Sequence, residues 1–247
     1  MTSKTLSAIP AMLASLLLSA CVGGAGDAAK PDAKAFEWAL SEDIRFNTVV
    51  TECSPLSPEL AKTAQQLRQQ WQKNYWPALS AADYQYNLKQ AARTYFYNGE
   101  KVSLPAVKLM TQQKSAALDS IYRAKRLPEK QREYCETRLS SYERHEDGLG
   151  NPAYKNRLLY LNELAQGHGA PALTPRALPS LAGTLGPSTS GASLYSVEQL
   201  SHSTGCQKPE IFTVHNQGPA ELFAVYCTPP QDMFISCEWG SCNRLAN

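Results

Sequence analysis

Apolar side chains recur every three or four residues over most of positions 35–166, which is the spacing of the buried face of a helix. The clearest stretch follows Ser57-Pro58-Glu59, a run typical of a helix start. Because proline interrupts the helical hydrogen-bond ladder, we expect this helix to end at Pro77. Its predicted buried stripe consists of Leu60, Ala64, Leu67, Trp71 and Tyr75.

Further helices are expected on either side of this one, and short connections join them. A second helix should begin at Ser80, whose spacing to Asp83 resembles a capping box, and should end at Asn98-Gly99. Later helical stretches are expected to end near Pro128, Gly148 and Gly167. Short connections favour antiparallel neighbours, so residues 35–166 are predicted to form an up-and-down bundle of about five or six helices.

The pattern changes after this bundle. Residues 167–204 are rich in Pro, Gly and Ser and nearly uncharged, and are predicted to form a linker in which only 194–200 is ordered. Residues 205–247 contain three short alternating stretches typical of strands, at 211–216, 222–226 and 233–238. The predicted fold is therefore multidomain α plus small β: a helical bundle, a linker and a small disulfide-rich antiparallel β module.

The N-terminal segment has the layout of an export signal. Residues 6–18 are mostly apolar, and about 13 apolar residues are too few to span a bilayer as a helix. The segment ends in Leu18-Ser19-Ala20-Cys21, which resembles the lipobox of bacterial lipoprotein precursors. The resemblance implies that residues 1–20 are a signal peptide and that Cys21 carries a diacylglycerol and becomes the acylated N-terminus.

The same resemblance predicts where the protein resides. Residues 21–34 contain almost nothing to bury and are expected to be a lipidated tether. In Gram-negative families an Asp after the cysteine favours retention in the inner membrane, and this chain has Val22 there. We therefore expect a cell-envelope lipoprotein in the outer membrane, facing the periplasm, with palmitate or a similar chain among its acyl groups.

Six cysteines remain once Cys21 is assigned to the lipid, and an even number in an exported protein predicts three disulfides. Pairing within each predicted domain, and a hairpin between 211–216 and 222–226, favour three bridges: Cys53–Cys135, Cys206–Cys227 and Cys237–Cys242. A zinc site is the alternative, but the spacing of the last four cysteines lacks the paired short knuckles that such sites use.

Composition and charge exclude some classes of function. The 24 Lys and Arg nearly balance the 22 Asp and Glu, which argues against a nucleic-acid binder. We find no nucleophile elbow, phosphate-binding loop or metal-ligand motif, so we predict no catalytic residues, no metal and no cofactor. Asp147 and Asn151 could flank a calcium ion, but capping explains both better. The basic run at 123–132 is interleaved with acids, which favours a paired helix surface over a membrane contact.

Aromatic side chains are the candidates for partner binding. Tyr86, Phe96 and Tyr97 fall off the predicted buried stripe, and Trp239 lies at the tip predicted between Cys237 and Cys242. The alternative for Trp239 is the core of the β module. The favoured function is a non-catalytic binding or scaffold lipoprotein for an envelope protein or a cell-wall component. The alternatives are an inhibitor or immunity-type lipoprotein, with the loop 228–231 as its plug, and a hydrolase with an unrecognised carboxylate site.

Overall fold

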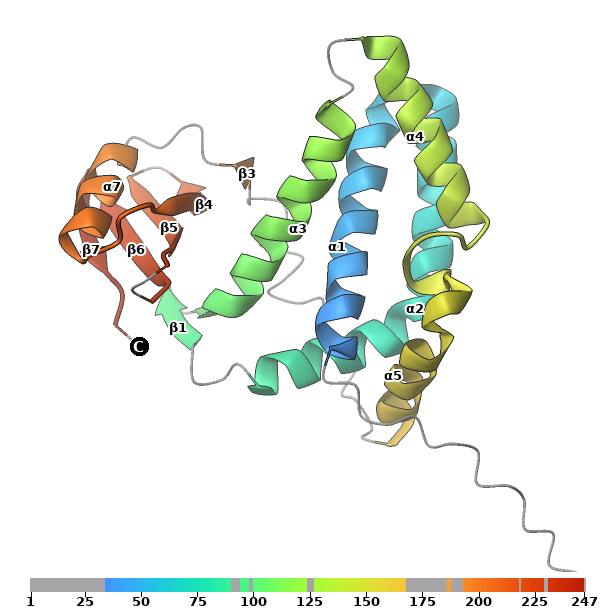
Figure 1. The fold of residues 1–247 in the computed structure, drawn as a ribbon, viewed down its shortest axis with the longest axis horizontal. Coiled ribbons are helices and arrows are strands. Elements are labelled where there is room, and N and C mark those ends of the chain that lie inside the picture. Colours follow the sequence, from blue (N-terminus) through green and yellow to red (C-terminus); the bar gives the residue numbers. More distant parts are fainter. Residues whose placement is uncertain are drawn as a thin grey trace, which may run out of the picture.

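The computed structural model describes residues 34–89, 94–97, 100–123, 127–167, 186–187, 193–217, 219–228 and 231–246. The fold is mostly helical and is followed by a small antiparallel sheet, as the sequence predicts (Figure 1). The predicted signal peptide, Cys21 and the predicted tether lie outside these residues, as does most of the predicted linker. No helix in the described ranges is long and apolar enough to span a membrane.

Helix α1 (Ala35–Cys53) is the centre of the helical part. It packs against α2 (Pro58–Lys89), α3 (Leu104–Tyr122), α4 (Pro128–Glu143) and α5 (Lys155–Gly167). Short 3₁₀ turns at Ser54–Leu56, Gly148–Gly150 and Pro152–Tyr154 connect neighbouring helices. Being surrounded, α1 buries apolar residues along most of its length, from Ala35 to Cys53.

The predicted break at Pro77 is wrong, because Pro77 lies inside the single long helix α2. Figure 1 shows that α2 changes direction partway along, which is how a helix accommodates a proline. A proline inside a helix costs about 3 kcal/mol. The residues after it, Ala78, Leu79 and Ala82, are almost fully buried, so packing offsets this cost.

The predicted helix up to Asn98 is also wrong in its second half. Thr94–Tyr97 is a strand, β1, and pairs antiparallel with β2 (Glu100–Ser103). Tyr97 is opposite Glu100, so Asn98-Gly99 links the two strands, and Asn-Gly is the strongest short signal for a hairpin. The run Thr-Tyr-Phe-Tyr also favours a strand, because aromatic and β-branched residues fit a pleated surface.

The sheet has the order β3-β4-β5-β6-β7, with every neighbouring pair antiparallel. The three predicted strands correspond to β4 (Glu210–Gln217), β5 (Ala220–Tyr226) and β6 (Met233–Glu238). Two short edge strands, β3 (Gly186–Pro187) and β7 (Ser241–Arg244), were not predicted. The central strand β5 is buried almost throughout, because both faces of the sheet are covered.

Helix α7 (Leu194–Ser203) covers one face of the sheet. It includes the one stretch of the predicted linker for which order was expected. Val197 of α7 packs against Phe223, Val225 and Ile235 on this face.

The opposite face of the sheet packs against α3 and the β1–β2 hairpin. One apolar cluster contains Val107 and Met110 of α3, Tyr95 of β1, and Leu222 and Phe234 of the sheet. The sequence suggested an independent module at the end of a linker. In the structure the sheet shares its core with α3, because two faces of a sheet this small both need cover.

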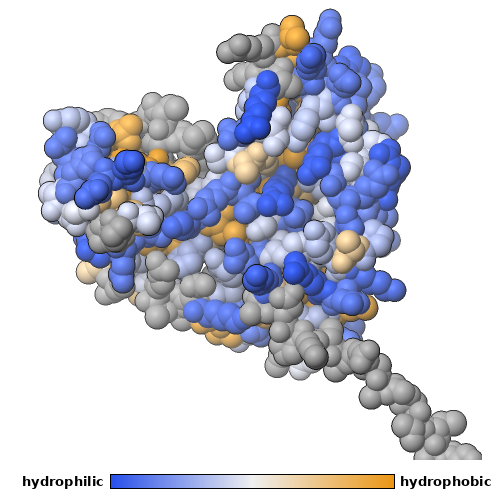
Figure 2. Space-filling view, in the orientation of Figure 1, coloured by the Kyte–Doolittle hydropathy of each residue, from blue (hydrophilic) through white to orange (hydrophobic). Residues whose placement is uncertain are grey.

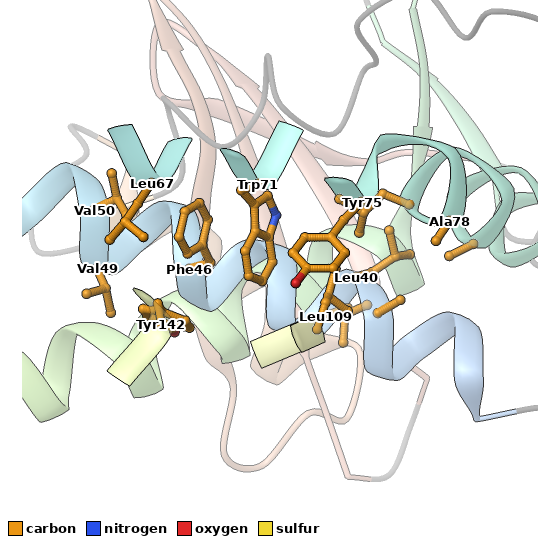
Figure 3. Packing of buried hydrophobic residues seen from close by; sticks show 14 of the residues in the cluster. Leu40, Phe46, Val49, Val50, Leu67, Trp71, Tyr75, Ala78, Leu109 and Tyr142 are labelled. Atoms are coloured by element: carbon orange, nitrogen blue, oxygen red, sulfur yellow. The ribbon is translucent and has the colours of Figure 1, made fainter. Parts of the chain in front are cut away.

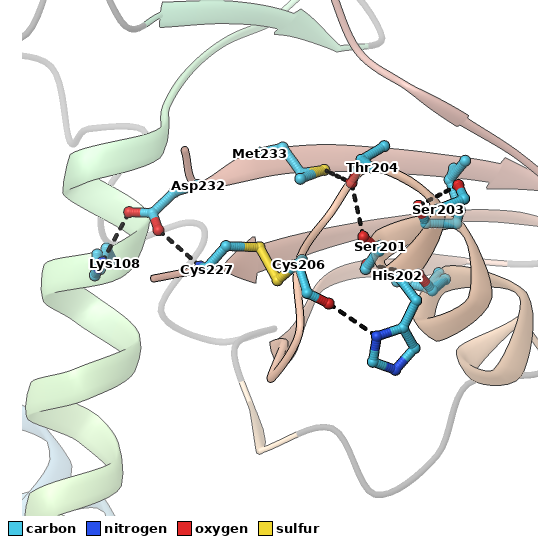
Figure 4. The surroundings of a disulfide bond; sticks show 11 residues. Lys108, Ser201, His202, Ser203, Thr204, Cys206, Cys227, Asp232 and Met233 are labelled. Carbon is cyan, nitrogen blue, oxygen red and sulfur yellow. Dashed lines mark hydrogen bonds and ion pairs between the residues drawn. A yellow bond between two sulfur atoms is a disulfide. The ribbon is translucent and has the colours of Figure 1, made fainter. Parts of the chain in front are cut away.

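Polar contacts strengthen the same junction. Lys108 of α3 forms an ion pair with Asp232, with 2.8 Å between Nζ and Oδ2. Asp232 Oδ1 accepts a hydrogen bond from the backbone N–H of Cys227 at 3.0 Å (Figure 4). The Cys227–Cys206 disulfide then links this network to the end of α7, where His202 Nδ1 donates to the Cys206 carbonyl at 2.8 Å. The sheet, α7 and α3 are thereby fastened together.

An aromatic stack forms the centre of the helical core (Figure 3). The rings of Phe46 and Trp71 are parallel, with centroids 3.9 Å apart, and Tyr142 meets Phe46 edge-on at 5.1 Å. Trp71 Nε1 donates to Asp43 Oδ1 at 2.9 Å, so the buried indole keeps its hydrogen bond. The backbone of Gly148 packs against the rings of Trp71 and Tyr142 in this stack.

All three predicted disulfides are present: Cys53–Cys135, Cys206–Cys227 and Cys237–Cys242. The first joins the end of α1 to the middle of α4, across a separation of 82 residues. The other two lie within the β unit, which here denotes α7 together with the sheet.

Candidate functional site

The turn between β6 and β7 presents the most exposed aromatic side chain among the described residues. Trp239 is 82% exposed, so it does not fold into the core. Trp239 and Gly240 both have positive φ, +52° and +80°, as a two-residue hairpin turn requires. Cys237 and Cys242 are directly opposite each other, and their disulfide closes the base of this turn.

A neighbouring turn supports Trp239 from the side. The backbone N–H of Trp239 donates to the carbonyl of Pro219 at 3.1 Å. Pro219 precedes β5, whose first residue, Ala220, pairs with Glu238. The two turns therefore lie at the same end of the sheet, and the indole is held on a backbone fixed by a disulfide and a hydrogen bond.

The start of α7 lies at this same end. The buried carboxylate of Glu221 accepts a hydrogen bond from the N–H of Ser193, at 3.1 Å from Oε2. A carboxylate at this position is favourable because helix N-termini carry partial positive charge. Glu221 pairs across the sheet with Cys237, which begins the Trp239 turn. Glu221 thus ties the start of α7 to the exposed turn.

A second exposed aromatic side chain stands on the first turn of α7. Tyr195 is 72% exposed, while its neighbour Leu194 packs against the cluster that contains Cys237 and Cys242. Tyr195 and Trp239 therefore lie at one end of the β unit, and we call this pair the aromatic end. Sequence reasoning missed Tyr195 because the stretch around it was assigned to a linker.

The other predicted partner-binding residues do not join the aromatic end. Tyr86 was expected to be exposed, which is wrong: it is buried in the helical core, and its hydroxyl donates to the Pro105 carbonyl at 3.3 Å. Tyr97 is half-buried, with its ring against His215 at 5.7 Å. Phe96 is exposed, but it alternates with the inward-facing Tyr95 and so faces away from the sheet.

A second cluster gathers charged side chains between α1 and α4. Arg45 contacts Glu42 at 2.9 Å, and Arg138 contacts Asp147 at 2.6 Å. Burial raises the pKa of Glu42 above its ordinary value, although Arg45 and Arg138 act in the opposite direction. Burial likewise raises the pKa of Tyr142 to about 12. Each acid here faces an arginine, so the arrangement is that of a structural ion-pair network.

Other acids of α1 are also engaged in packing contacts. Asp43 accepts from Trp71, and Glu52 accepts from the Tyr122 hydroxyl at 2.5 Å. Hydrolysis by a carboxylate pair needs two acids facing each other across a substrate cleft. Asp43 and Glu52 instead join helices. Glu42 pairs with Arg45 on its own helix, and Asp147 pairs with Arg138 of α4, so these acids give the hydrolase alternative no support.

The residues around 147–151 have structural roles. Asp147 accepts from Arg138 and from the Ser141 hydroxyl. Asn151 Oδ1 accepts from the Ala153 N–H at 2.9 Å and so caps the following turn, as expected. Within the described ranges, no group of three or more His, Cys, Asp or Glu side chains is placed to hold a metal ion.

Two predicted features fall at the limits of the described residues. The suggested inhibitory loop at 228–231 lies partly outside them, although its flank is fixed by Asp232. In the basic run, Arg132 pairs with Glu136 at 2.9 Å, as a paired helix surface would.

No family model, curated protein or solved structure matches this chain.

Proposed function

We propose that this chain is a lipid-anchored envelope lipoprotein that binds a protein or cell-wall partner without catalysis. The observation that carries the proposal is Trp239, a large aromatic side chain presented to solvent on a turn closed by a disulfide. The anchor is Cys21, carrying the diacylglycerol and the N-terminal acyl chain implied by the lipobox, and the location is the periplasmic face of the outer membrane. Three disulfides suit an oxidising compartment.

The energetics of binding favour an aromatic side chain on a rigid turn. Association costs conformational entropy for each flexible group that becomes ordered. The backbone around Trp239 is already fixed by Cys237–Cys242 and by the hydrogen bond to Pro219, so little backbone freedom remains to be lost. Trp and Tyr are also the residues that most often contribute large shares of interface binding energy.

The proposal is tested by capture of the partner from native membranes. The full chain is crosslinked in its envelope, and the attached partners are quantified for wild type and for Trp239→Ala. We expect the variant to lose at least about ten-fold in capture, the effect of a hot spot of roughly 1.4 kcal/mol or more. The matched control is Leu127→Ala, which truncates an exposed apolar side chain far from the aromatic end.

Thermal unfolding separates binding from folding. Because Trp239 is exposed, its loss should leave the melting temperature unchanged. Equal capture by wild type and Trp239→Ala, with both chains folded, would overturn the assignment of the aromatic end.

A further inference from the structure

We propose that the end of the helical part at which α1 begins lies against an anionic phospholipid bilayer. The inference rests on the lipid anchor of the proposed function, because the anchor decides which end of the molecule meets the membrane. We call this surface the base. It consists of six exposed side chains: Lys34 directly before α1, Leu88 and Lys89 at the end of α2, Tyr154 in the 3₁₀ turn before α5, and Lys155 and Leu159 in the first half of α5.

Contacts to the first turn of α1 bring these three segments together. Lys89 of α2 places its Nζ 4.4 Å from the centre of the Phe36 ring. Tyr160 of α5 also packs on Phe36, with ring centroids 6.1 Å apart. The exposed Leu88 and Leu159 are the sequence neighbours of these two residues. Figure 1 shows the start of α1, the second part of α2 and α5 at the same end of the molecule.

The length of chain before α1 limits how far the base can be from the anchor. Residues 22–33 separate Cys21 from Lys34. A chain of this length cannot span more than about 45 Å even when fully extended. The base is therefore the part of the folded protein that the anchor holds nearest to the lipid.

The chemistry of the base matches a membrane interface. Leu88 is 53% exposed and Leu159 is 46% exposed, so both present apolar surface to solvent. Near these leucines in the sequence and at the start of α1, four basic residues outnumber the two acids Glu37 and Glu163: Lys34, Lys89, Lys155 and Arg157. Apolar side chains flanked by Lys and Arg are the pattern of surfaces that lie on anionic lipid. Figure 2 shows hydrophobic patches among hydrophilic ones along this lower edge.

Docking of the base would orient the whole molecule. Strand β7 and helix α7 lie at the left edge of Figure 1, away from α5 and the start of α1. Trp239 lies in the turn that leads into β7, so the aromatic end would be held away from the bilayer.

The test maps contact between the lipidated protein and photoreactive lipid. The processed chain is purified with its lipid and reconstituted in vesicles of phosphatidylethanolamine and phosphatidylglycerol that contain a diazirine phospholipid. After irradiation, peptides are mapped by mass spectrometry. We expect labelling of the peptides that contain Leu88 and Leu159, and at least five-fold less labelling of the Leu127 and Trp239 peptides.

Charge variants make the test specific. Leu88→Glu combined with Leu159→Glu should reduce labelling of the base at least five-fold. Leu127→Glu should not, although Leu127 is equally exposed, at 53%. The anchor keeps every variant on the vesicle, so a loss of labelling reports lost contact rather than lost attachment. Equal melting temperatures would show that the variants remain folded.

Two results would overturn the inference. Labelling spread evenly over the surface, or unchanged in the double variant, would show that the base does not meet the bilayer, while the anchor and the aromatic end would stand. Absence of fatty acid on the N-terminal peptide would overturn both the inference and the proposed anchor, and mass spectrometry of the same sample distinguishes the two cases.

Discussion

The hydroxyl oxygens of Thr111 and Tyr226 lie 2.8 Å apart, in a hydrogen bond that is buried between α3 and the end of β5. These residues are 115 positions apart in the chain. Burial raises the pKa of the Tyr226 hydroxyl, so it remains protonated and able to donate throughout the physiological range. This pair, with Lys108 and Asp232 beside it, joins the helical part to the sheet.

The junction predicts that Tyr226→Phe is destabilising. The variant keeps the ring but loses the hydrogen bond, which should lower the free energy of unfolding by about 1 kcal/mol. Urea denaturation measures the change, and Tyr195→Phe is the matched control because Tyr195 is exposed. Equal losses in the two variants would contradict the role of the junction.

Removal of the sheet should destabilise the helices as well. Without residues 205–247, Val107 and Met110 of α3 would lose their apolar neighbours. We expect the melting temperature of the remainder to fall by many degrees, as measured by circular dichroism. An unchanged melting temperature would mean that the helical part folds independently, as the sequence alone suggested.

Gly148→Ala should be strongly destabilising, by about 2–4 kcal/mol. Gly148 has φ +70°, a region unfavourable to other residues, and an added Cβ would lie 2.9 Å from the Trp71 ring. Gly167→Ala is the matched control, because a Cβ there meets nothing within 4 Å. Chemical denaturation of both variants should show a loss only for Gly148→Ala.

The disulfides should contribute unequally to stability. Chain entropy predicts about 4–5 kcal/mol for Cys53–Cys135, whose ends are 82 residues apart, and about 2 kcal/mol for Cys237–Cys242, whose ends are 5 apart. Paired Cys→Ser variants of each bridge, compared by urea denaturation, test the order. A larger loss from the short bridge would contradict it.

Glu42 should make stability depend on pH. Burial raises its pKa in the folded state, so the folded chain binds a proton more readily than the unfolded chain. The contribution of Glu42 is therefore greatest below its unfolded pKa, near 4.5, and is lost as pH rises through the folded pKa. Relative to Glu42→Gln, the wild type should lose stability as the pH rises above about 4.5. Unfolding curves in which it gains stability over that range would contradict the sign.

The sequence predicted those features that depend on local pattern. Periodic apolar positions located most of the helices and three of the strands, and pairing within each predicted domain together with a predicted hairpin led to the correct cysteine pairs. The sequence wrongly predicted a helix end at Pro77, because the packing of Ala78 and Leu79 outweighs the cost of a proline inside the helix. It failed at Thr94–Tyr97, where the Asn-Gly turn signal was taken for a helix end.

The candidate site was predicted only in part. Trp239 was identified because two cysteines bracket it, a signal that is local in sequence. Tyr195 was missed because its position depends on Glu221 and Cys237, which are distant in sequence. Tyr86 was wrongly expected to be exposed. The apolar stripe of a single helix does not show which other elements pack against the remaining faces of that helix.

The shared core of α3 and the sheet has a consequence for how the chain folds as it emerges during export, N-terminal end first. The N-terminal helices are made first, and Leu104, Val107 and Met110 remain uncovered until the strands β4 to β6 follow. Contacts between segments so far apart form slowly, and uncovered apolar surface invites aggregation in the interval. A nascent chain would therefore depend on a holding chaperone until its last forty or so residues arrive. In any product truncated before β5, this apolar face of α3 would stay uncovered, which would expose the product to degradation.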